Sequence, residues 1–427
     1  MESKAELYIP QVFRTFQGFE IQDIKEWQDK RQMELVLVKK PDRRHLCCRC
    51  GHELGRMDGR YWLRAQHMRV MGWTVAVSFW REKRHCPACR KVRSEAVDFL
   101  CPTTPHATLE LSWWINRLTE ITSVLAVSHL ESIDKMTCYA VDKYILRRLL
   151  EGYKIPEVTA ISVDEVYARS KKQQKEGETR DDLFLTVIVD IKTHKAIWVS
   201  KSRRKEALDQ FFILLGPEAS AKIEVVATDQ HEGYAASIKQ YCPKATQVWD
   251  RFHLMQIFEE AMNETRKELH LEQAGGSEMK RLTRGQYRFM FLKKADRRTG
   301  EERTHIDSVL KENAQFAKLE LIKERMLTFF DQPDEVAAKT VFEEIGDWIF
   351  QAGFGPLMRW IQRLEKGWET LKNYFRYRVT TGVSEGINRA IKGLKWQAYG
   401  YKDMDYFALK ILQKVGYLNS RYHMLTV

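Results

Sequence analysis

The sequence predicts a multidomain α+β protein, and three observations support this fold class. Two Cys-x-x-Cys pairs lie in a strand-rich first quarter, strand and helix patterns alternate in the middle, and a helical period then continues with few strand signals. At 427 residues the chain is too long for one compact core. We therefore expect five consecutive segments: residues 1–104, 105–155, 156–258, 259–378 and 379–427.

The first segment, residues 1–104, is predicted to be a β module that binds zinc. Its pairs Cys47-x-x-Cys50 and Cys86-x-x-Cys89 have the spacing of a four-thiolate Zn²⁺ site, and Gly51 permits a tight turn after the first pair. The long interval between the pairs can hold a β-meander. Without one structural zinc, this module should unfold. Ordinary buried cysteines or a redox pair are the alternatives, and nearby side chains could replace a ligand: Cys48, His45, His52 and His85.

Residues 105–155 resemble a helix-turn-helix segment. The helical pattern covers Trp113–Leu125, Val127–Leu130 and, after a turn, Thr137–Leu150. The last helix would lie in the major groove of DNA and present three cations: Lys143, Arg147 and Arg148. A helical connector with a charged outer face is the alternative.

Residues 156–258 are predicted to form the first part of an α/β core. Five strands are expected at Ala160–Val166, Leu183–Asp190, Lys195–Ser200, Glu224–Thr228 and Thr246–Trp249. Helices are expected at Arg204–Leu215 and Tyr234–Tyr241. Three strands, a helix, a strand, a helix and a fifth strand form a ribonuclease-H-like order. The charged stretch Lys171–Asp182 should be an exposed hairpin loop.

Residues 259–378 read as an all-helical insertion into this core. The helical period runs from Leu254 to Tyr374 almost without a break. A helix starting near Val383 then closes the core, and Tyr406–Leu418 forms a last helix. The stretch 359–378 interleaves aromatic and basic residues, and the aromatics are expected either in the helical core or stacked on an unpaired base.

Charge points to a polyanionic partner. Lys and Arg total 70 against 58 Asp and Glu, a formal net charge of +12, and neutralised phosphates release counterions. Solubility alone is the other explanation. We expect a cytoplasmic protein with reduced thiols and no membrane partner, because the N-terminal residues lack an apolar signal core and no run approaches about 18 apolar residues.

Three carboxylates are the candidate catalytic residues. Asp164 lies in the first core strand, Asp229 follows the fourth strand, which neighbours the first in this order, and Glu385 lies in the first turn of the closing helix. Two divalent ions held by carboxylates can drive an in-line displacement at phosphorus, and Mg²⁺ needs only a few such ligands. Each residue alone could be a turn, a cap or a dipole partner. Their joint arrangement favours a metal-dependent phosphoryl-transfer site.

Other residues near these carboxylates compete for the role or assist it. Glu165, Asp190 and Asp250 are rivals, but Glu165 should face away from Asp164, and Asp190 suits a hairpin turn. Candidate DNA contacts lie on the polar face of the closing helix and after the fifth strand: Asn388, Arg389, Lys392, Arg251 and His253.

Several motifs together resemble the DDE transposases of bacterial insertion sequences, in the ISL-three group. They are Ile161–Glu165, Thr228–Tyr234, Trp249–Leu254, Thr380–Lys392 and Ala398–Tyr401. Each is weak alone, but together they are specific, and the resemblance covers nearly the whole chain.

The resemblance implies a ribonuclease-H-like catalytic core with a DDE triad of Asp164, Asp229 and Glu385. It implies two Mg²⁺ ions, which Mn²⁺ can replace, and an N-terminal zinc element. The implied activity is cleavage at terminal inverted repeats, followed by attack of the freed 3′-hydroxyl on target DNA. A homodimer on paired DNA ends in the bacterial nucleoid would carry it out. A structure-selective nuclease and a catalytically silent, zinc-dependent DNA-binding regulator are the alternatives.

Overall fold

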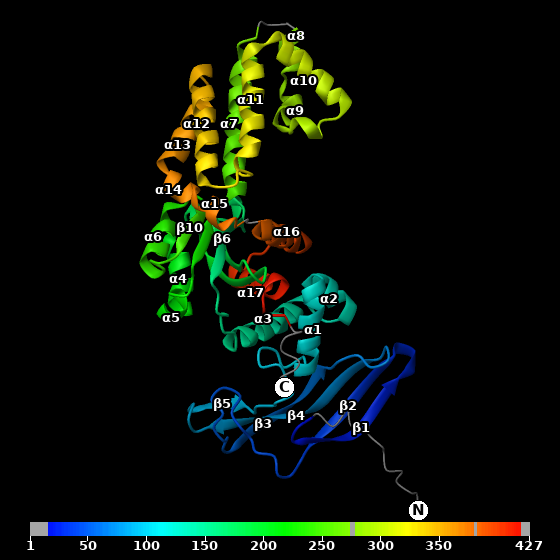
Figure 1. The fold of residues 1–427 in the computed structure, drawn as a ribbon. Helices are drawn as coiled ribbons and strands as arrows, with labels where there is room; N and C mark the ends of the chain where they lie inside the picture. Colours follow the sequence, from blue (N-terminus) through cyan, green and yellow to red (C-terminus); the bar gives the residue numbers. More distant parts are fainter. Residues whose placement is uncertain (1–15, 274–277, 380–381, 420–427) are drawn as a thin grey trace, which may run out of the picture. The chain divides into compact units, whose positions relative to one another are not determined.

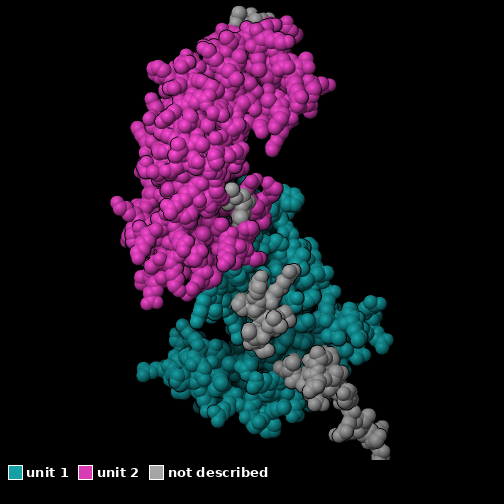
Figure 2. Space-filling model, in the orientation of Figure 1, with its two compact units in different colours: residues 1–154, 392–427 teal, residues 155–391 magenta. Residues whose placement is uncertain are grey.

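The computed structural model describes residues 16–273, 278–379 and 382–419. The chain divides into two compact units (Figure 2). Unit 1 combines residues 1–154 with 392–427, and unit 2 consists of residues 155–391. None of the helices in the described ranges combines the length and apolar character needed to cross a bilayer.

Unit 1 begins with a mixed β-sheet that contains both antiparallel and parallel strand pairs. Its strands are β1 (Phe19–Trp27), β2 (Gln32–Lys39), β3 (Met57–Gln66), β4 (Thr74–Cys86) and β5 (Lys91–Ser94), with a 3-10 turn at Gln28–Lys30. The order is β1-β2-β4-β3, β5 pairs with β4, and β2 and β4 are parallel. Alternate residues of β2 and β4, such as Leu35 and Val77, are buried with Phe19, Phe79 and Phe99 in a core on one face. The predicted β module is therefore present.

Helices α1 (Leu109–Ile121), α2 (Val124–Glu131) and α3 (Lys135–Glu151) follow the sheet. Side chains cap each N-terminus: Thr108, Ser123 and Asp134 accept hydrogen bonds from the first turns. The first helix begins four residues before the predicted Trp113 because Thr108 provides this cap. The last helix, α17 (Met404–Val415), packs on α3 through a buried ion pair between Lys410 and Asp142 at 3.3 Å.

Unit 2 contains the predicted α/β arrangement (Figure 1). Its strands are β6 (Ala160–Tyr167), β7 (Phe184–Asp190), β8 (Lys195–Lys201), β9 (Val225–Thr228) and β10 (Thr246–Trp249), and its helices are α4 (Lys205–Leu215), α5 (Pro217–Ser220) and α6 (Glu232–Tyr241). The sheet order is β10-β9-β6-β7-β8. β9 is parallel to β6 and β10, whereas β7 is antiparallel to β6 and β8. The central strand of this sheet is therefore β6.

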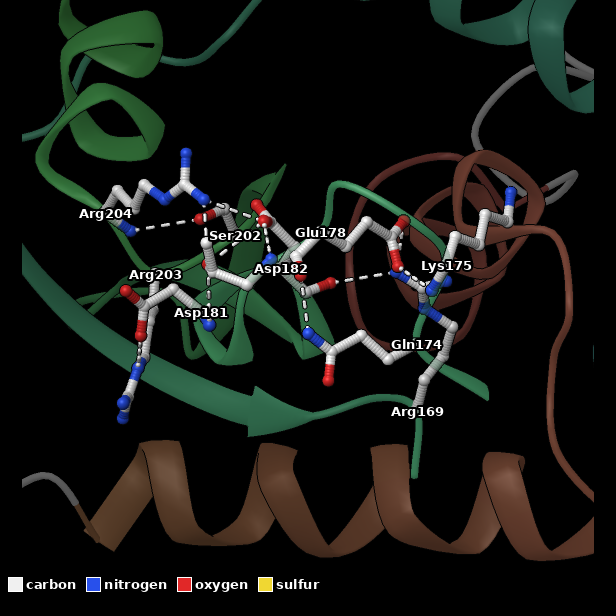
Figure 3. A network of polar contacts seen from close by, with 10 residues as sticks. Arg169, Gln174, Lys175, Glu178, Asp181, Asp182, Ser202, Arg203 and Arg204 are labelled. Atoms are coloured by element: carbon white, nitrogen blue, oxygen red, sulfur yellow. Dashed lines mark hydrogen bonds and ion pairs between the residues drawn. The ribbon is translucent and has the colours of Figure 1, made fainter. Parts of the chain in front are cut away.

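The loop between β6 and β7 is ordered by buried and exposed arginines (Figure 3). It contains short 3-10 turns at Lys171–Gln173 and Arg180–Leu183. The Arg169 side chain is buried and donates hydrogen bonds to Glu178 Oε1 at 2.8 Å and Asp182 O at 3.1 Å. Arg204, at the start of α4, donates to Asp182 Oδ2 at 2.7 Å. The expected hairpin loop is thus held by contacts within itself and by an ion pair with Arg204 at the start of α4.

The helical insertion lies between β10 and the closing helix. Its elements are α7 (Arg251–Leu271), α8 (Glu278–Leu282), α9 (Arg288–Leu292), α10 (Gly300–Glu312), α11 (Ala314–Phe329), α12 (Glu335–Ala352), α13 (Gly355–Lys366), α14 (Trp368–Leu371) and α15 (Asn373–Tyr377), with 3-10 turns at Gly285–Tyr287 and Ala295–Arg297. The long helices α7, α11, α12 and α13 lie side by side (Figure 1). Trp360, Tyr374 and Phe375 are buried between them, so these aromatics of the stretch 359–378 belong to the core.

Helix α16 (Gly382–Gln397) is the closing helix of the α/β core, and its residues after Ile391 belong to unit 1. Thr380 and Thr381, which open its motif, lie outside the described residues. Its apolar face carries Ile387, Ile391 and Leu394, and all three are buried. The unit boundary falls after Ile391, so one continuous helix joins the two units.

Candidate active site and metal centre

Four cysteines of unit 1 form a compact cluster. The Sγ atoms of Cys47, Cys50, Cys86 and Cys89 lie within 4.8 Å of one another. Individual separations are 4.0 Å for Cys47–Cys89, 3.5 Å for Cys50–Cys86 and 3.4 Å for Cys50–Cys89. A tetrahedral ion with metal–sulfur bonds of about 2.3 Å requires sulfur–sulfur edges of about 3.8 Å. The cluster therefore fits a tetrahedral metal ion.

Backbone N–H groups support this cluster. Arg49 N–H lies 3.5 Å from Cys47 Sγ, and Cys89 N–H donates to Cys86 Sγ at 3.3 Å. Although burial opposes its ionisation, hydrogen bonds from the Arg49 and Cys50 N–H groups lower the pKa of Cys47 to about 6. A thiolate is the form that binds metal, so these backbone N–H groups favour ligation by Cys47.

The alternative ligands near the cysteines make other contacts or stay outside the cluster. His45 Nδ1 lies 3.0 Å from Glu95 Oε2, His52 Nδ1 lies 3.3 Å from Cys50 O, and Cys48 is exposed. Within the described ranges, the cluster contains only the four cysteines of the two pairs, so His85 is outside it as well.

In unit 2, strand pairing brings Asp164 and Asp229 to the same level of the sheet. Ser162 of β6 pairs with Ala227 of β9 in a parallel ladder, and each aspartate lies two residues further along its strand direction. Burial raises the pKa of Asp229, and the charge of Asp164 raises it further, while His253 and His231 act against this shift. Two carboxylates in this arrangement repel each other, and a cation between them would relieve that repulsion.

The His253 imidazole contacts one of these two carboxylates. It lies in the first turn of α7, and its Nε2 is 3.3 Å from Asp164 Oδ1 and 3.7 Å from Asp250 Oδ2. The hydrogen bond to Asp164 raises the pKa of His253 to about 9 against the effect of burial, and the charges of Asp164, Asp250 and Asp229 contribute. His253, predicted as a DNA contact, is thus positioned on the carboxylates.

Helix α16 meets β6 through its polar face. Ser384 Oγ lies 2.7 Å from Ser162 Oγ, and Asn388 Nδ2 donates to Asp164 Oδ2 at 2.6 Å. Glu385 faces another direction: it is 45% exposed and pairs with Arg389 Nη2 at 2.9 Å. Among the described residues, the cysteines are the only group of three or more ligands found close enough for one ion, so Glu385 is not gathered with the aspartates.

The rival carboxylates have structural partners. Glu165 faces Arg203 at 3.7 Å, and burial raises its pKa to about 7, with a further contribution from the charge of Asp229. Asp190 accepts hydrogen bonds from Lys192 N and Thr193 Oγ1 in the hairpin turn, as predicted. Asp250 caps α7 by accepting from Phe252 N at 2.9 Å.

The remaining predicted DNA contacts differ in accessibility. Lys143 of α3 forms an ion pair with Asp403, whereas Arg147 and Arg148 on the same helix are exposed. Arg251 lies 3.4 Å from Tyr374 Oη, 3.6 Å from Asp331 and over the Phe330 ring. On α16, Arg389 is 80% exposed in its side chain, and Lys392 is exposed.

A pocket of about 220 Å³ lies beside Asp229 in unit 2. Among the lining residues that the sequence analysis did not name as site residues, three are polar: Gln230, His231 and Arg363. The first two follow Asp229 directly, so their proximity to the site was the available signal. Arg363 lies in the aromatic and basic stretch 359–378. The full lining is Asp229, Gln230, His231, Trp249, Asp250, His253, Leu254, Ile257 and Arg363.

Comparison with known proteins supports one family. Residues 161–411 match the family model of the ISL3 (ISL-three) group of DDE transposases, and the description of that family is "Transposase". The chain is 24% identical over 400 residues to the transposase for insertion sequence element IS1001 of Bordetella parapertussis, covering 93% of this chain and 95% of that protein. It is also 33% identical over 88 residues to the transposase for insertion sequence element IS1557 of Mycobacterium tuberculosis, covering 21% and 20% of the two chains. The family match spans more than half of the sequence and includes all three candidate carboxylates. The chain therefore belongs to the ISL3 family of DDE transposases.

Proposed function

We propose that this transposase binds the terminal inverted repeats of its insertion sequence, cleaves at the ends and joins the 3′-hydroxyls to target DNA. The observation that carries the proposal is the position of two carboxylates on neighbouring parallel strands of the sheet β10-β9-β6-β7-β8. Asp164 lies on β6 two residues after Ser162, and Asp229 directly follows β9 two residues after Ala227, the residue that pairs with Ser162. This strand order, followed by a helix that contacts the central strand, supports a ribonuclease-H-like core.

Asp164, Asp229 and Glu385 would hold two Mg²⁺ ions, with Mn²⁺ as a substitute. The donor set suits such ions, because these carboxylates are hard oxygen ligands and Asp164 and Asp229 are close enough that the charge of Asp164 raises the pKa of Asp229. When bound, the ions supply activation of the attacking oxygen and stabilisation of the leaving oxygen. Asn388 holds Asp164 in orientation through its hydrogen bond. Glu385 joins the aspartates only when its carboxylate leaves Arg389.

DNA recognition is assigned to unit 1 and to the exposed face of α16. The cysteine cluster would hold one structural Zn²⁺, since its sulfur spacing matches a tetrahedral site. Helices α2 and α3 form the helix-turn-helix, whose exposed Arg147 and Arg148 would contact DNA. Arg389 and Lys392 are placed to meet phosphates near the active site. We expect a homodimer on the paired ends, in the cytoplasm of the bacterium.

The test is DNA cleavage by three variants, Asp164→Ala, Asp229→Ala and Glu385→Ala. Each should lower end cleavage by roughly 10³-fold or more, because transition-state stabilisation of several kcal/mol is lost, and each should still bind the end. The substrate is the genomic DNA that flanks the gene, with Mg²⁺. Glu206→Gln, an exposed carboxylate change at the start of α4, is the control and should cleave normally.

The products of the same assay separate the alternatives. Joined donor and target DNA supports a transposase, cleaved but unjoined DNA supports a structure-selective nuclease, and binding without cleavage by the wild type supports a regulator. Undiminished cleavage by all three alanine variants would refute the triad.

A further inference from the structure

The pocket beside Asp229 has features that the cleavage mechanism does not use. Its walls come from the β9–α6 connection, the end of β10, the first turns of α7 and from α13 of the helical insertion. It thus lies between the catalytic sheet and the insertion, both within unit 2. An inference about its ligand rests on the proposed function, because that function supplies DNA as the molecule at Asp229.

Two side chains that follow Asp229 have unused hydrogen-bonding atoms. Both amide atoms of Gln230, Nε2 and Oε1, and the Nδ1 atom of His231 are buried and have no hydrogen-bond partner within the described part of the chain. Buried polar atoms are normally paired, and an amide offers a donor and an acceptor side by side. A ligand that presents an acceptor and a donor side by side, as the edge of a nucleobase does, could satisfy both amide atoms after the Gln230 side chain rotates toward it.

A cation lies on another wall of this pocket. Arg363 of α13 is exposed and makes no hydrogen bond or ion pair with any described residue. Arg359, one turn earlier on the same helix, lies 3.9 Å from Glu264. The two arginines are therefore matched in type and helix but differ in their relation to the pocket, and only Arg363 lines it. A free guanidinium beside a site for DNA suits a phosphate.

An aromatic ring lines the pocket at a fixed position. The Trp249 indole packs so closely on Gly367 that a Cβ at residue 367 would lie 1.7 Å from Trp249 Cη2. Gly367 has a φ of −102°, which other residues also adopt, so this glycine is needed for space rather than for backbone conformation. Trp249 therefore has one settled place, and an indole is a stacking partner for any base.

We propose that this pocket binds one nucleotide of the DNA end, directly next to the cleaved phosphodiester. Arg363 binds its phosphate, Trp249 contacts the face of its base, and the Gln230 amide bonds to the edge of the base. Asp229 and Asp250 also line the pocket, and their charges disfavour a phosphate inside, which places the base inward and the phosphate at Arg363. The nucleotide must leave the base stack to enter, as bases do in other enzyme pockets.

The experiment measures binding without cleavage. The Asp164→Ala protein is titrated with terminal-repeat duplexes that carry 2-aminopurine at the last transposon nucleotide or at the first flanking nucleotide. Unstacking in the pocket should change the fluorescence at one of these two positions and not at a position five base pairs inside the end. Adding Gln230→Leu should remove this position-specific change. If neither terminal position responds differently from the internal one, the proposal is wrong.

The phosphate contact is tested separately by salt dependence. Arg363→Ala should reduce the slope of log affinity against log salt by about 0.9, as expected for one lost phosphate contact, while Arg359→Ala should leave the slope unchanged. Equal slopes for the two variants would overturn the role of Arg363.

A change in the DNA substrate tests the base contact independently of the fluorescence change. An abasic site at the responding position should weaken binding to the otherwise unaltered Asp164→Ala protein about tenfold, and should weaken binding to the Gln230→Leu form much less. Equal losses in both forms would contradict the base contact. All three readouts are equilibrium binding, so a failed cleavage assay would refute the proposed function without altering these results, and a failed fluorescence change would refute the pocket without altering cleavage.

Discussion

The two candidate metal sites of this protein differ in whether their candidate ligands lie close together. In unit 1, four cysteine sulfurs lie at ligand spacing around a common centre. In unit 2, Asp164 and Asp229 are adjacent, but hydrogen bonds from His253 and Asn388 satisfy Asp164, and Glu385 pairs with Arg389. The cysteines have few competing partners, because thiols are weak hydrogen-bonding groups. Carboxylates accept strong hydrogen bonds from nearby cations and amides, so protein groups compete with metal ions for these oxygens.

This difference predicts different consequences of metal loss. A structural site contributes its binding free energy to folding, whereas a catalytic site contributes to the transition state. The cysteine module should therefore depend on its ion for stability, and the α/β core should keep its fold when its ions are removed.

The largest expected effect is the loss of the cysteine site. Cys47→Ser should release about one equivalent of zinc and unfold the β module, because structural zinc contributes on the order of 10 kcal/mol to folding. Metal analysis and thermal unfolding measure this. Cys48→Ser is the matched control, since Cys48 is adjacent but exposed and outside the cluster, and it should keep the metal. A native wild-type protein free of metal would contradict the assignment.

A smaller effect is expected when Asp164 loses its amide partner. Asn388→Ala removes the hydrogen bond to Asp164 Oδ2, and the loss of such an orienting contact typically lowers activity about 10- to 100-fold. Single-turnover cleavage at saturating Mg²⁺ measures it. Gln397→Ala removes another amide of the same helix, 3.5 Å from Ile121 O, and should leave cleavage unchanged. If Asn388 acts only as a DNA contact, weaker end binding would account for the whole loss, and saturating DNA would restore the rate.

Much of the fold was predictable because short local sequence patterns identify most of its strands and helices. Strand β10 was predicted with its observed bounds, Thr246–Trp249, and the other core strands differ by one residue at most at either end. Strands β7 and β9 are short, almost fully buried runs between turn residues, and this pattern identifies them directly. Helix α1 begins four residues before the predicted Trp113, at the residue that follows the capping Thr108.

The candidate site was less predictable, because it depends on how distant segments meet. The sequence placed Glu385, Asn388 and Arg389 on one polar face, but the rotation of α16 directs Asn388 to Asp164 and leaves Glu385 with Arg389. Likewise, Lys143 was expected to be free for DNA, but it pairs with Asp403, which is distant in sequence. Spacing along a helix shows which residues share a face, but it does not show which part of the protein that face contacts.

The smallest expected effect concerns the pair that keeps Glu385 apart from the aspartates. An exposed ion pair contributes only about 0.2–1 kcal/mol. Arg389→Ala should therefore lower the Mg²⁺ concentration for half-maximal cleavage by at most about fivefold, because Glu385 becomes free to act as a ligand. The titration is made at saturating DNA, which removes any contribution of Arg389 to end binding. Arg389→Lys keeps the charge next to Glu385 and should behave like the wild type. If the Mg²⁺ concentration for half-maximal cleavage is unchanged or higher in Arg389→Ala, the Glu385–Arg389 pair does not compete with the metal. The difference between the cysteine site and the carboxylate site would then not come from the protein groups that bind their ligands.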